Sequence, residues 1–180
     1  MKQTATLLIH HAARGPHSQP PNSLSALQAC LEARARVVEV DISPLADGNF
    51  ALLHGPSLEQ STDGSGPISE HTADQVRRLR LVWCGEVTDE PVGLLSDALE
   101  LIRRHAPPVS LQLDLKPYVP LSDATLAALV AALEPVKERV RVSSVADWDV
   151  RRLRALDAEL PLGFDPMLYL EVDPREEEAS

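Results

Sequence analysis

Short apolar runs alternate with amphipathic stretches along most of the chain. Runs rich in branched residues and bounded by turn residues predict strands, whereas apolar residues spaced three and four apart predict helices. The predicted strands cover residues 6–10, 37–42, 50–54, 109–115, 139–145 and 162–164. The predicted helices cover residues 23–34, 72–79, 96–105 and 148–156, and a further stretch that ends before Pro135.

Polar residues at the starts of these helices are candidate N-caps. Asn22 or Ser23 precedes the first long helix, Ser96 precedes the third, and Ser122 precedes the fourth. Serine and asparagine are favoured there because their side chains accept a hydrogen bond from a free backbone N–H. Residues 55–70, rich in Gly, Ser, Thr and Asp, predict a long loop.

Alternating strands and helices predict a mostly parallel sheet flanked by helices. The pattern alone fits both an open doubly wound sheet and a barrel. The first predicted strand is not followed by a G-x-G-x-x-G sequence, so it gives no support to a dinucleotide-binding fold. The length of 180 residues suits one domain, for which we predict residues 1–174, with a frayed acidic tail at 175–180.

Composition narrows the classes of partner. Lys and Arg total 17 against 27 for Asp and Glu, giving a net charge of −10 that argues against a nucleic-acid binder and against docking on an anionic membrane. No apolar run reaches the length of a membrane span, and the run at residues 5–9 is shorter than a signal-peptide core. We therefore expect a cytoplasmic protein whose two cysteines are buried thiols.

The first candidate for chemistry is the end of strand one, where His10 and His11 precede Arg14. A histidine there could act as an acid or base near neutral pH, and an arginine could hold a phosphate oxygen. The alternative is a histidine that only makes a structural hydrogen bond.

Carboxylates follow on two later strands. Glu39 and Asp41 point to the same face of their strand, and two adjacent carboxylates repel unless a cation lies between them. Asp114 is a candidate third ligand, and Lys116 could neutralise a phosphate. Oxygen ligands suit Mg²⁺ or Ca²⁺. The alternatives are a solvent-facing acidic edge and a simple ion pair between Asp114 and Lys116.

His54 ends the strand that follows the Asp47-Gly48 turn. A tight hairpin at that turn would place His54 opposite Asp41, beside the carboxylate pair. A short crossover could also bring the two together at one end of a barrel. Alone, His54 could equally be a strand-end residue with no role.

At these residues the sequence resembles the glycerophosphodiester phosphodiesterases. The family pattern contains His-Arg-Gly, Pro-Glu-Asn-Thr, Glu-x-Asp, Asp-Gly, His-Asp, Thr-Asp-Gly-x-Gly and an acidic residue two before a lysine. This chain has, in the same order, Arg14-Gly15, Pro20-Pro21-Asn22-Ser23, Glu39-Val40-Asp41, Asp47-Gly48, His54, Thr62-Asp63-Gly64-Ser65-Gly66 and Asp114-Leu115-Lys116. The similarity runs from about Ile9 to Pro117 and more weakly to Phe164.

The resemblance implies a TIM-type (β/α) barrel and cleavage of a glycerophosphodiester to glycerol phosphate and an alcohol. It implies that Glu39, Asp41 and Asp114 bind a divalent cation, Mg²⁺ or Ca²⁺. It also implies that a strand-one histidine and His54 form the acid/base pair, with Arg14 and Lys116 near the phosphate; the substrate-binding residue is then Arg14.

Departures from the pattern qualify these implications. Ala13 stands where the family has its first histidine, so we expect His11 to serve through a bulge at Ala12-Ala13, with His10 as the alternative. Gly55 replaces the Asp after the second histidine, and Asp114 stands where Glu is common.

Length is the largest departure, because a complete barrel needs roughly 250 residues. About six of eight strands are predicted here, so the barrel is expected to be incomplete. The chain is then a truncated product or a fragment, or it closes its barrel by pairing with another copy through its open edges. Two alternatives to glycerophosphodiester hydrolysis follow. The chain could be a non-catalytic remnant of the family, or it could act on another phosphodiester such as a lysophospholipid.

Overall fold

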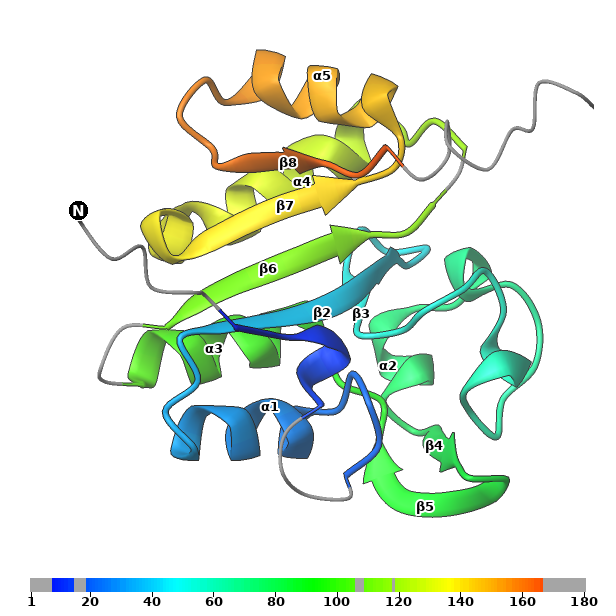
Figure 1. Ribbon diagram of the computed structural model, residues 1–180. Helices are drawn as coiled ribbons and strands as arrows, with labels where there is room; N and C mark the ends of the chain where they lie inside the picture. Colours follow the sequence, from blue (N-terminus) through cyan, green and yellow to red (C-terminus); the bar gives the residue numbers. More distant parts are fainter. Residues whose placement is uncertain (1–7, 15–18, 106–108, 118, 167–180) are drawn as a thin grey trace, which may run out of the picture.

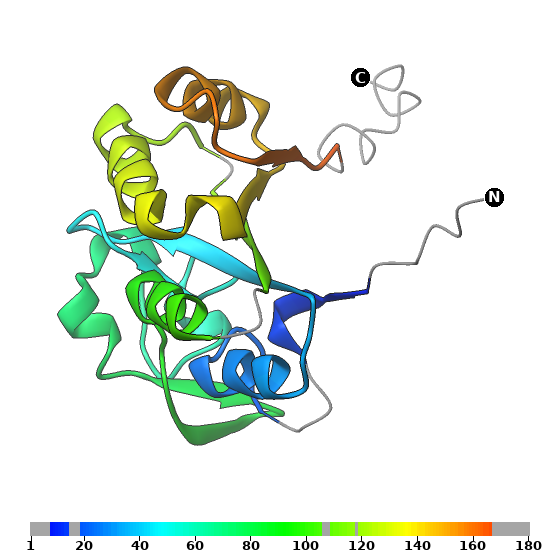
Figure 2. The same ribbon diagram turned by 90° about the vertical axis from the view of Figure 1, so that its left-hand side faces the viewer.

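A curved sheet with helices on one of its faces forms the body of the protein (Figure 1, Figure 2). The structure is a computed structural model that describes residues 8–14, 19–105, 109–117 and 119–166. The described part of the first predicted strand begins at Leu8, and the predicted acidic tail lies outside the described residues. The strands of the main sheet are β1 (Ile9–His10), β2 (Val37–Pro44), β3 (Phe50–Ala51), β6 (Ser110–Leu115), β7 (Val140–Ser144) and β8 (Leu162–Phe164).

The strand order is β1-β2-β6-β7-β8, and these five strands pair in parallel. All six strands predicted from the sequence are therefore present in the 6-stranded sheet, which confirms the mostly parallel architecture. The sixth, β3, lies off this path and pairs antiparallel with the end of β2.

The predicted register of that antiparallel pair is wrong. Ser43 lies opposite Ala51, and β3 ends there, so Asp41 and His54 are not cross-strand partners. The reason is a competing contact after Ala51: the N–H of Leu52 donates to the carbonyl of Gly93 at 2.9 Å. The chain thereby leaves β2 before it reaches His54.

Four helices of nine residues or more cover the outer face of the sheet (Figure 2). Ser23 and Ser122 cap two of them as predicted, through bonds from the N–H groups of Ala26 and Thr125. Ser96 is not a cap, because α3 begins at Leu95 and Ser96 lies exposed in its first turn. The helices are α1 (Leu24–Glu32), α2 (Ala73–Val76), α3 (Leu95–Arg104), α4 (Asp123–Leu133) and α5 (Asp147–Leu156), with 3-10 turns at His11–Ala13, Leu58–Gln60, Ile68–Glu70 and Glu134–Arg139.

The faces of the sheet differ in polarity. On β2, Val38, Val40 and Ile42 are fully buried in the hydrophobic core that the helices share with the sheet. Because successive strand residues point to opposite faces, Glu39 and Asp41 project from the other face. The same alternation on β6 puts Leu111, Leu113 and Leu115 in the core and polar residues opposite them. The open face of the sheet therefore carries polar side chains, whereas the opposite face carries the residues of the core.

Residues 45–94 form an excursion with a hydrophobic cluster of its own. Leu53, Leu58, Ile68, Val76 and Leu81 are among its buried members. The excursion contains a hairpin that the sequence analysis did not assign, made of β4 (Arg80–Trp83) and β5 (Glu86–Pro91). Its turn consists of Cys84 and Gly85, which both have positive φ, the conformation of a type I′ hairpin turn. Cys84 is exposed there, so the expectation of buried thiols is wrong for Cys84 and confirmed for Cys30.

None of the described helices is long and apolar enough to cross a bilayer, and the longest, α4, has 11 residues.

We expect Ser23→Ala to lower the free energy of unfolding by about 1–2 kcal/mol, since it removes the N-cap of α1. The Ser23 hydroxyl is fully buried and also donates to the carbonyl of Pro20 at 2.7 Å. Ser96→Ala is the matched control and should change stability by less than about 0.5 kcal/mol, because an exposed helical serine makes no cap. Urea unfolding of both variants measures the difference; equal losses would show that Ser23 does not cap α1.

Candidate active site

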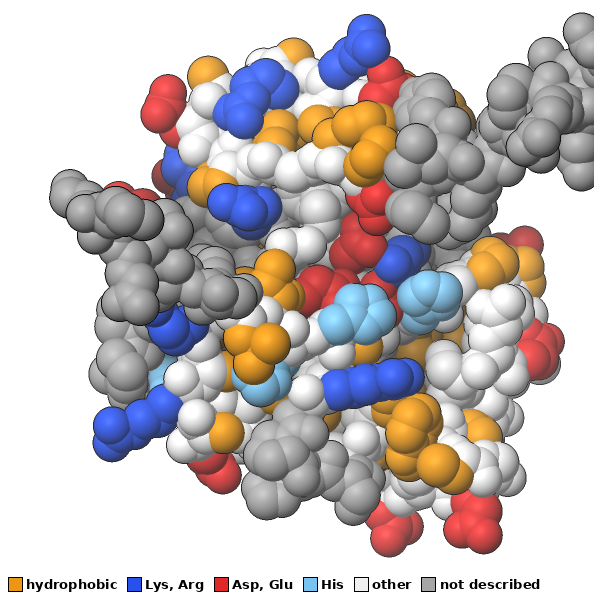
Figure 3. Space-filling model, viewed as in Figure 1, with side chains coloured by type: hydrophobic (Ala, Val, Ile, Leu, Met, Phe, Trp, Pro, Cys, Tyr) orange, Lys and Arg blue, Asp and Glu red, His pale blue; other side chains and the backbone are white. Residues whose placement is uncertain are grey.

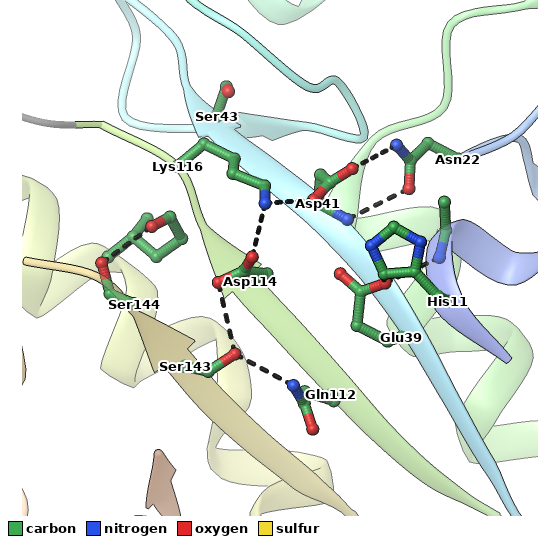
Figure 4. A network of polar contacts seen from close by, with 12 residues as sticks. His11, Asn22, Glu39, Asp41, Ser43, Gln112, Asp114, Lys116, Ser143 and Ser144 are labelled. Atoms are coloured by element: carbon green, nitrogen blue, oxygen red, sulfur yellow. Dashed lines mark hydrogen bonds and ion pairs between the residues drawn. The ribbon is translucent and has the colours of Figure 1, made fainter. Parts of the chain in front are cut away.

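Three carboxylates of the neighbouring strands β2 and β6 meet on the open face of the sheet (Figure 4). Glu39 and Asp41 come from β2 and Asp114 from β6, and Asp41 pairs in register with Asp114. Each offers one oxygen within 4.8 Å of the other two, so the group could hold a metal ion. In the space-filling view, acidic, basic and histidine side chains gather in a hollow near the middle of this face (Figure 3).

Lys116 lies among these carboxylates. Its Nζ is 2.8 Å from Oδ1 of Asp41 and 2.5 Å from Oδ2 of Asp114. Burial disfavours the ammonium charge, but the hydrogen bonds and charges of Asp114 and Asp41 outweigh burial and raise the pKa of Lys116. Lys116 therefore stays charged at neutral pH and joins two strands through one cation.

Glu39 is the carboxylate without a basic partner of this kind. It is 3% exposed, and its Oε2 accepts a hydrogen bond from the N–H of Ala12 at 2.6 Å. Its Oε1 is buried and has no hydrogen-bond partner. Burial raises the pKa of Glu39, and the charges of Asp41 and Asp114 raise it further, against the Ala12 N–H and His11, which lower it. A buried carboxylate oxygen left unpaired beside two others fits a cation ligand.

Asn22 holds Asp41 from the side opposite Lys116. Its Nδ2 donates to Oδ2 of Asp41 at 2.6 Å, and its Oδ1 accepts from the backbone N–H of Asp41 at 3.1 Å. Asn22 has φ 57, a left-handed conformation that asparagine tolerates better than most residues. From the sequence, Asn22 is only a candidate helix cap. Its place in the Pro-Pro-Asn-Ser stretch of the family pattern is the signal that could have indicated its contact with Asp41.

A tight turn at the end of β1 places the two histidines differently. Ala12 and Ala13 both have φ near 50°, at 52 and 51, and form the 3-10 turn that replaces the expected bulge. Nε2 of His11 lies 3.8 Å from Oε2 of Glu39. His10 instead places Nδ1 3.3 Å from the carbonyl of Arg14. The structure thus brings His11, rather than His10, to the carboxylates.

Two cavities flank the carboxylate group, and His11 lines both. The first, of about 350 Å³, is also lined by Arg14, Asp41, His54 and Trp83. His54 reaches it from the chain after β3 rather than through strand pairing. The second, of about 450 Å³, is lined by Glu39, Gln112, Asp114, Lys116, Arg141 and Ser143, among others. All seven residues singled out from the sequence therefore line one cavity or the other.

The replacement of the family's Asp by Gly55 has a local explanation. Gly55 has φ +91, a conformation that side chains disfavour. A Cβ at this position would lie 1.6 Å from Oε1 of Gln60. The backbone after His54 is therefore shaped for glycine.

A series of side-chain hydrogen bonds that was not predicted from the sequence connects β6 and β7. Gln112 donates to Oγ of Ser143 at 3.2 Å, and Oγ of Ser143 donates to Oδ1 of Asp114 at 3.3 Å. Ser143 pairs in register with Asp114. The alternation on β7 indicates that Arg141 and Ser143 share a face of the sheet, but it does not indicate which residues of β6 they lie beside.

A family model described as the glycerophosphoryl diester phosphodiesterase family matches residues 11–176. The chain belongs to this family. The sequence resemblance to these enzymes is thereby confirmed, and it extends past the motifs to most of the described residues.

Curated relatives carry the family's name. The chain is 27% identical over 150 residues to mouse glycerophosphodiester phosphodiesterase 1, covering 81% of this chain and 45% of that protein. It is 24% identical over 164 residues to the glycerophosphodiester phosphodiesterase of Caldanaerobacter subterraneus, covering 88% of this chain and 66% of that protein. The chain thus spans about half the length of its mouse relative.

Solved family structures share the fold. A phosphodiesterase from Oleispira antarctica, in complex with the product sn-glycerol-3-phosphate, superposes with a TM-score of 0.75 at 27% identity, covering 88% of this chain and 65% of that one. A protein from Galdieria sulphuraria described as a putative glycerophosphodiester phosphodiesterase gives a TM-score of 0.79 at 20% identity, covering 91% of this chain and 66% of that one. The fold of this family member is therefore a TIM-type barrel, present here in part, as predicted.

We expect Glu39→Gln to raise the melting temperature of the metal-free chain at neutral pH by about 2–4 °C, the shift that about 1 kcal/mol produces at this size. Because burial raises the pKa of Glu39, its charged form destabilises the fold at pH values above that pKa. The wild type should recover this loss as pH falls through the raised pKa, so the difference between the two proteins should shrink. Thermal unfolding in chelator across this pH range measures it, and a constant difference would contradict the explanation.

Proposed function

We propose that this chain hydrolyses glycerophosphodiesters to glycerol phosphate and an alcohol. One observation carries the proposal: a buried carboxylate group with an unpaired oxygen stands between two cavities, and a histidine that lines both lies beside it. The family membership and the glycerol phosphate bound to the Oleispira relative support this choice of substrate.

The metal would be held by Glu39, Asp41 and Asp114. Three carboxylates carry three negative charges and Lys116 carries one positive charge, so a divalent cation would balance the group. Oxygen donors on rigid strands suit Mg²⁺ or Ca²⁺, and the unpaired Oε1 of Glu39 offers a free ligand position. A bound cation would supply positive charge to the phosphate oxygens as charge develops on them.

His11 and His54 are our candidates for proton transfer. Both line the 350 Å³ cavity and both are exposed, so substrate and water can reach them. In the proposed reaction one imidazole takes a proton from the attacking water, and the other donates a proton to the alcohol oxygen as its bond to phosphorus breaks. Glu39, whose Oε2 lies 3.8 Å from Nε2 of His11, would orient this ring.

Positive side chains would hold the phosphate. Arg14 lines the 350 Å³ cavity and Lys116 lines the 450 Å³ cavity, so each of the two cavities beside the carboxylates has a cationic side chain. Both can neutralise charge on a phosphodiester, and arginine can also donate through two N–H groups at once.

Association of two copies stays a prediction. Among the described residues, β1 and β8 are the outermost strands of the parallel order, and Leu8, Ile9 and Phe164 are exposed beside them. A single domain over residues 1–174 and a cytoplasmic location also stay predictions.

We expect the purified chain to release glycerol phosphate from glycerophosphocholine with Mg²⁺ or Ca²⁺, and to stop when excess chelator is added. Glu39→Ala and Asp41→Ala should each abolish the metal-dependent release, since each removes a ligand. Metal should also raise the wild-type melting temperature but not that of Glu39→Ala; a metal concentration 100 times the dissociation constant corresponds to about 2.7 kcal/mol.

The outcomes of these assays separate two failures. Unchanged hydrolysis in both variants would contradict the metal site. A folded chain that gains stability from metal but releases no product would retain the site without the activity, as expected for a non-catalytic remnant.

We expect His11→Ala to lower kcat/KM at least tenfold more than His10→Ala. General acid or base catalysis contributes about 10²–10⁴-fold, and only His11 lies within reach of Glu39 and the cavities. His10→Ala is the matched control, because it removes the neighbouring imidazole from a position outside both cavities. A larger loss from His10→Ala would show that His10, rather than His11, has the catalytic role.

A further inference from the structure

We infer that Trp83, on the β4–β5 hairpin, is a positioning residue that holds the guanidinium of Arg14 over the cavity for an anionic phosphate. Cζ of Arg14 lies over the Trp83 ring, 5.6 Å from its centroid. That distance is within the range of about 6 Å at which a cation is attracted to an indole face. This inference rests on the proposed function, since it assigns Arg14 to the phosphate of the substrate.

Arg14 has no carboxylate partner among the described residues. Several arginines elsewhere in the structure, such as Arg77, Arg103 and Arg152, each contact an Asp or Glu within 4.0 Å. The guanidinium of Arg14 instead lies over the indole ring of Trp83. An exposed guanidinium that is held in place but not neutralised keeps its full charge for a ligand.

The contact with the ring leaves the donors of Arg14 free. The N–H groups of a guanidinium lie in its plane, whereas a tryptophan attracts the cation through the face of the indole. An arginine held in this way loses mobility without using its hydrogen bonds. It can therefore donate to two phosphate oxygens with less ordering of the side chain than a free arginine would need.

The hairpin is a firm support for Trp83. Leu81, two residues before it, is buried in the second hydrophobic cluster and forms a bridge with Thr62. The N–H of Val82 donates to the carbonyl of Ser61 at 2.8 Å, and Trp83 pairs with Glu86 across the turn. Trp83 is partly buried and lines the same 350 Å³ cavity as Arg14, His11 and His54. The hairpin thus contributes an aromatic side chain to a cavity whose charged side chains come from the strands and the segments that follow them.

The test is a double-mutant cycle on the binding of sn-glycerol 3-phosphate, measured by titration calorimetry with Mg²⁺ present. We expect Trp83→Ala to weaken binding by about two- to fivefold, the effect of a cation–π contact at an exposed site. The same change made in the Arg14→Ala protein should have no further effect. Trp83→Phe should retain part of the affinity, because phenylalanine also presents an aromatic face, and Trp83→Leu should not.

Val87→Ala is the matched control, since Val87 is exposed on the same hairpin and does not line the cavity. NMR adds a readout that needs no ligand: the Nε–H resonance of Arg14 should show a ring-current shift that disappears in Trp83→Ala. Unfolding curves establish that each variant is folded.

Equal binding by the wild type and Trp83→Ala, or an equal loss in the Arg14→Ala background, would overturn the inference. Arg14-dependent binding that is lost in Trp83→Ala, in a chain that hydrolyses nothing, would sustain it while the proposed activity fails. A wild-type chain that binds no glycerol phosphate would overturn the phosphate role of both residues.

Discussion

The crowding of three carboxylates on two adjacent strands is the constraint on which the rest of the site depends. Glu39 and Asp41 are 3% and 1% exposed, so water screens their repulsion poorly. Lys116 offsets part of it by contacting Asp41 and Asp114, and Asn22 and the N–H of Ala12 each donate to one carboxylate. What remains is an unpaired oxygen on Glu39 and an excess of negative charge. A group in this condition could hold a cation, and a bound cation would make the acidic composition compatible with an anionic substrate.

Strain in the neighbouring turn serves the same arrangement. Left-handed alanines are unfavourable, by about 1–3 kcal/mol each when a position is forced into a sparse region of backbone space. Ala12 and Ala13 adopt this conformation with their polar groups satisfied: the Ala12 carbonyl accepts from Asn22 at 2.9 Å and the Ala13 carbonyl accepts from Cys30 at 3.2 Å. The turn reverses the chain between His11 and Arg14, so both residues face cavities that border one carboxylate group. A straight continuation of β1 would carry them apart.

Much of this fold could be predicted from the sequence because its core strands are marked by strong alternation. On β2 and β6 the leucine, valine and isoleucine residues of the core alternate with polar residues of the open face, so one pattern predicts the strand, its buried face and the candidate ligands. The family motifs imply a role for His54, whose position after β3 depends on the hydrogen bond between Leu52 and Gly93 that no local pattern reveals.

Other features depend on contacts between distant segments and could not be predicted locally. The β4–β5 hairpin has no apolar alternation on β5, whose residues are mostly exposed, and its pairing with residues 61–63 is long-range. Ser96 looks like a cap, but the buried positions Leu95, Ala98 and Ile102 determine where α3 begins. Ser143 and Arg141 come to the site through the register of β7 with β6, which the sequence does not specify.

The site therefore divides into two parts with different mechanical support. The carboxylates and Lys116 come from β2 and β6, which are central in the sheet and buried against the helices on one face. Arg14 comes from the turn after β1, whereas His54 and Trp83 come from a loop and a hairpin of the excursion, which has its own smaller cluster. Cation ligands need a fixed geometry, which a central pair of strands provides, whereas groups that contact substrate need access and some freedom to adjust. The contact between Arg14 and Trp83 connects the turn that follows β1 to the excursion, beside the cavity that both residues line. Loss of that contact should loosen the side of the cavity for which we propose phosphate binding and leave the carboxylate group intact.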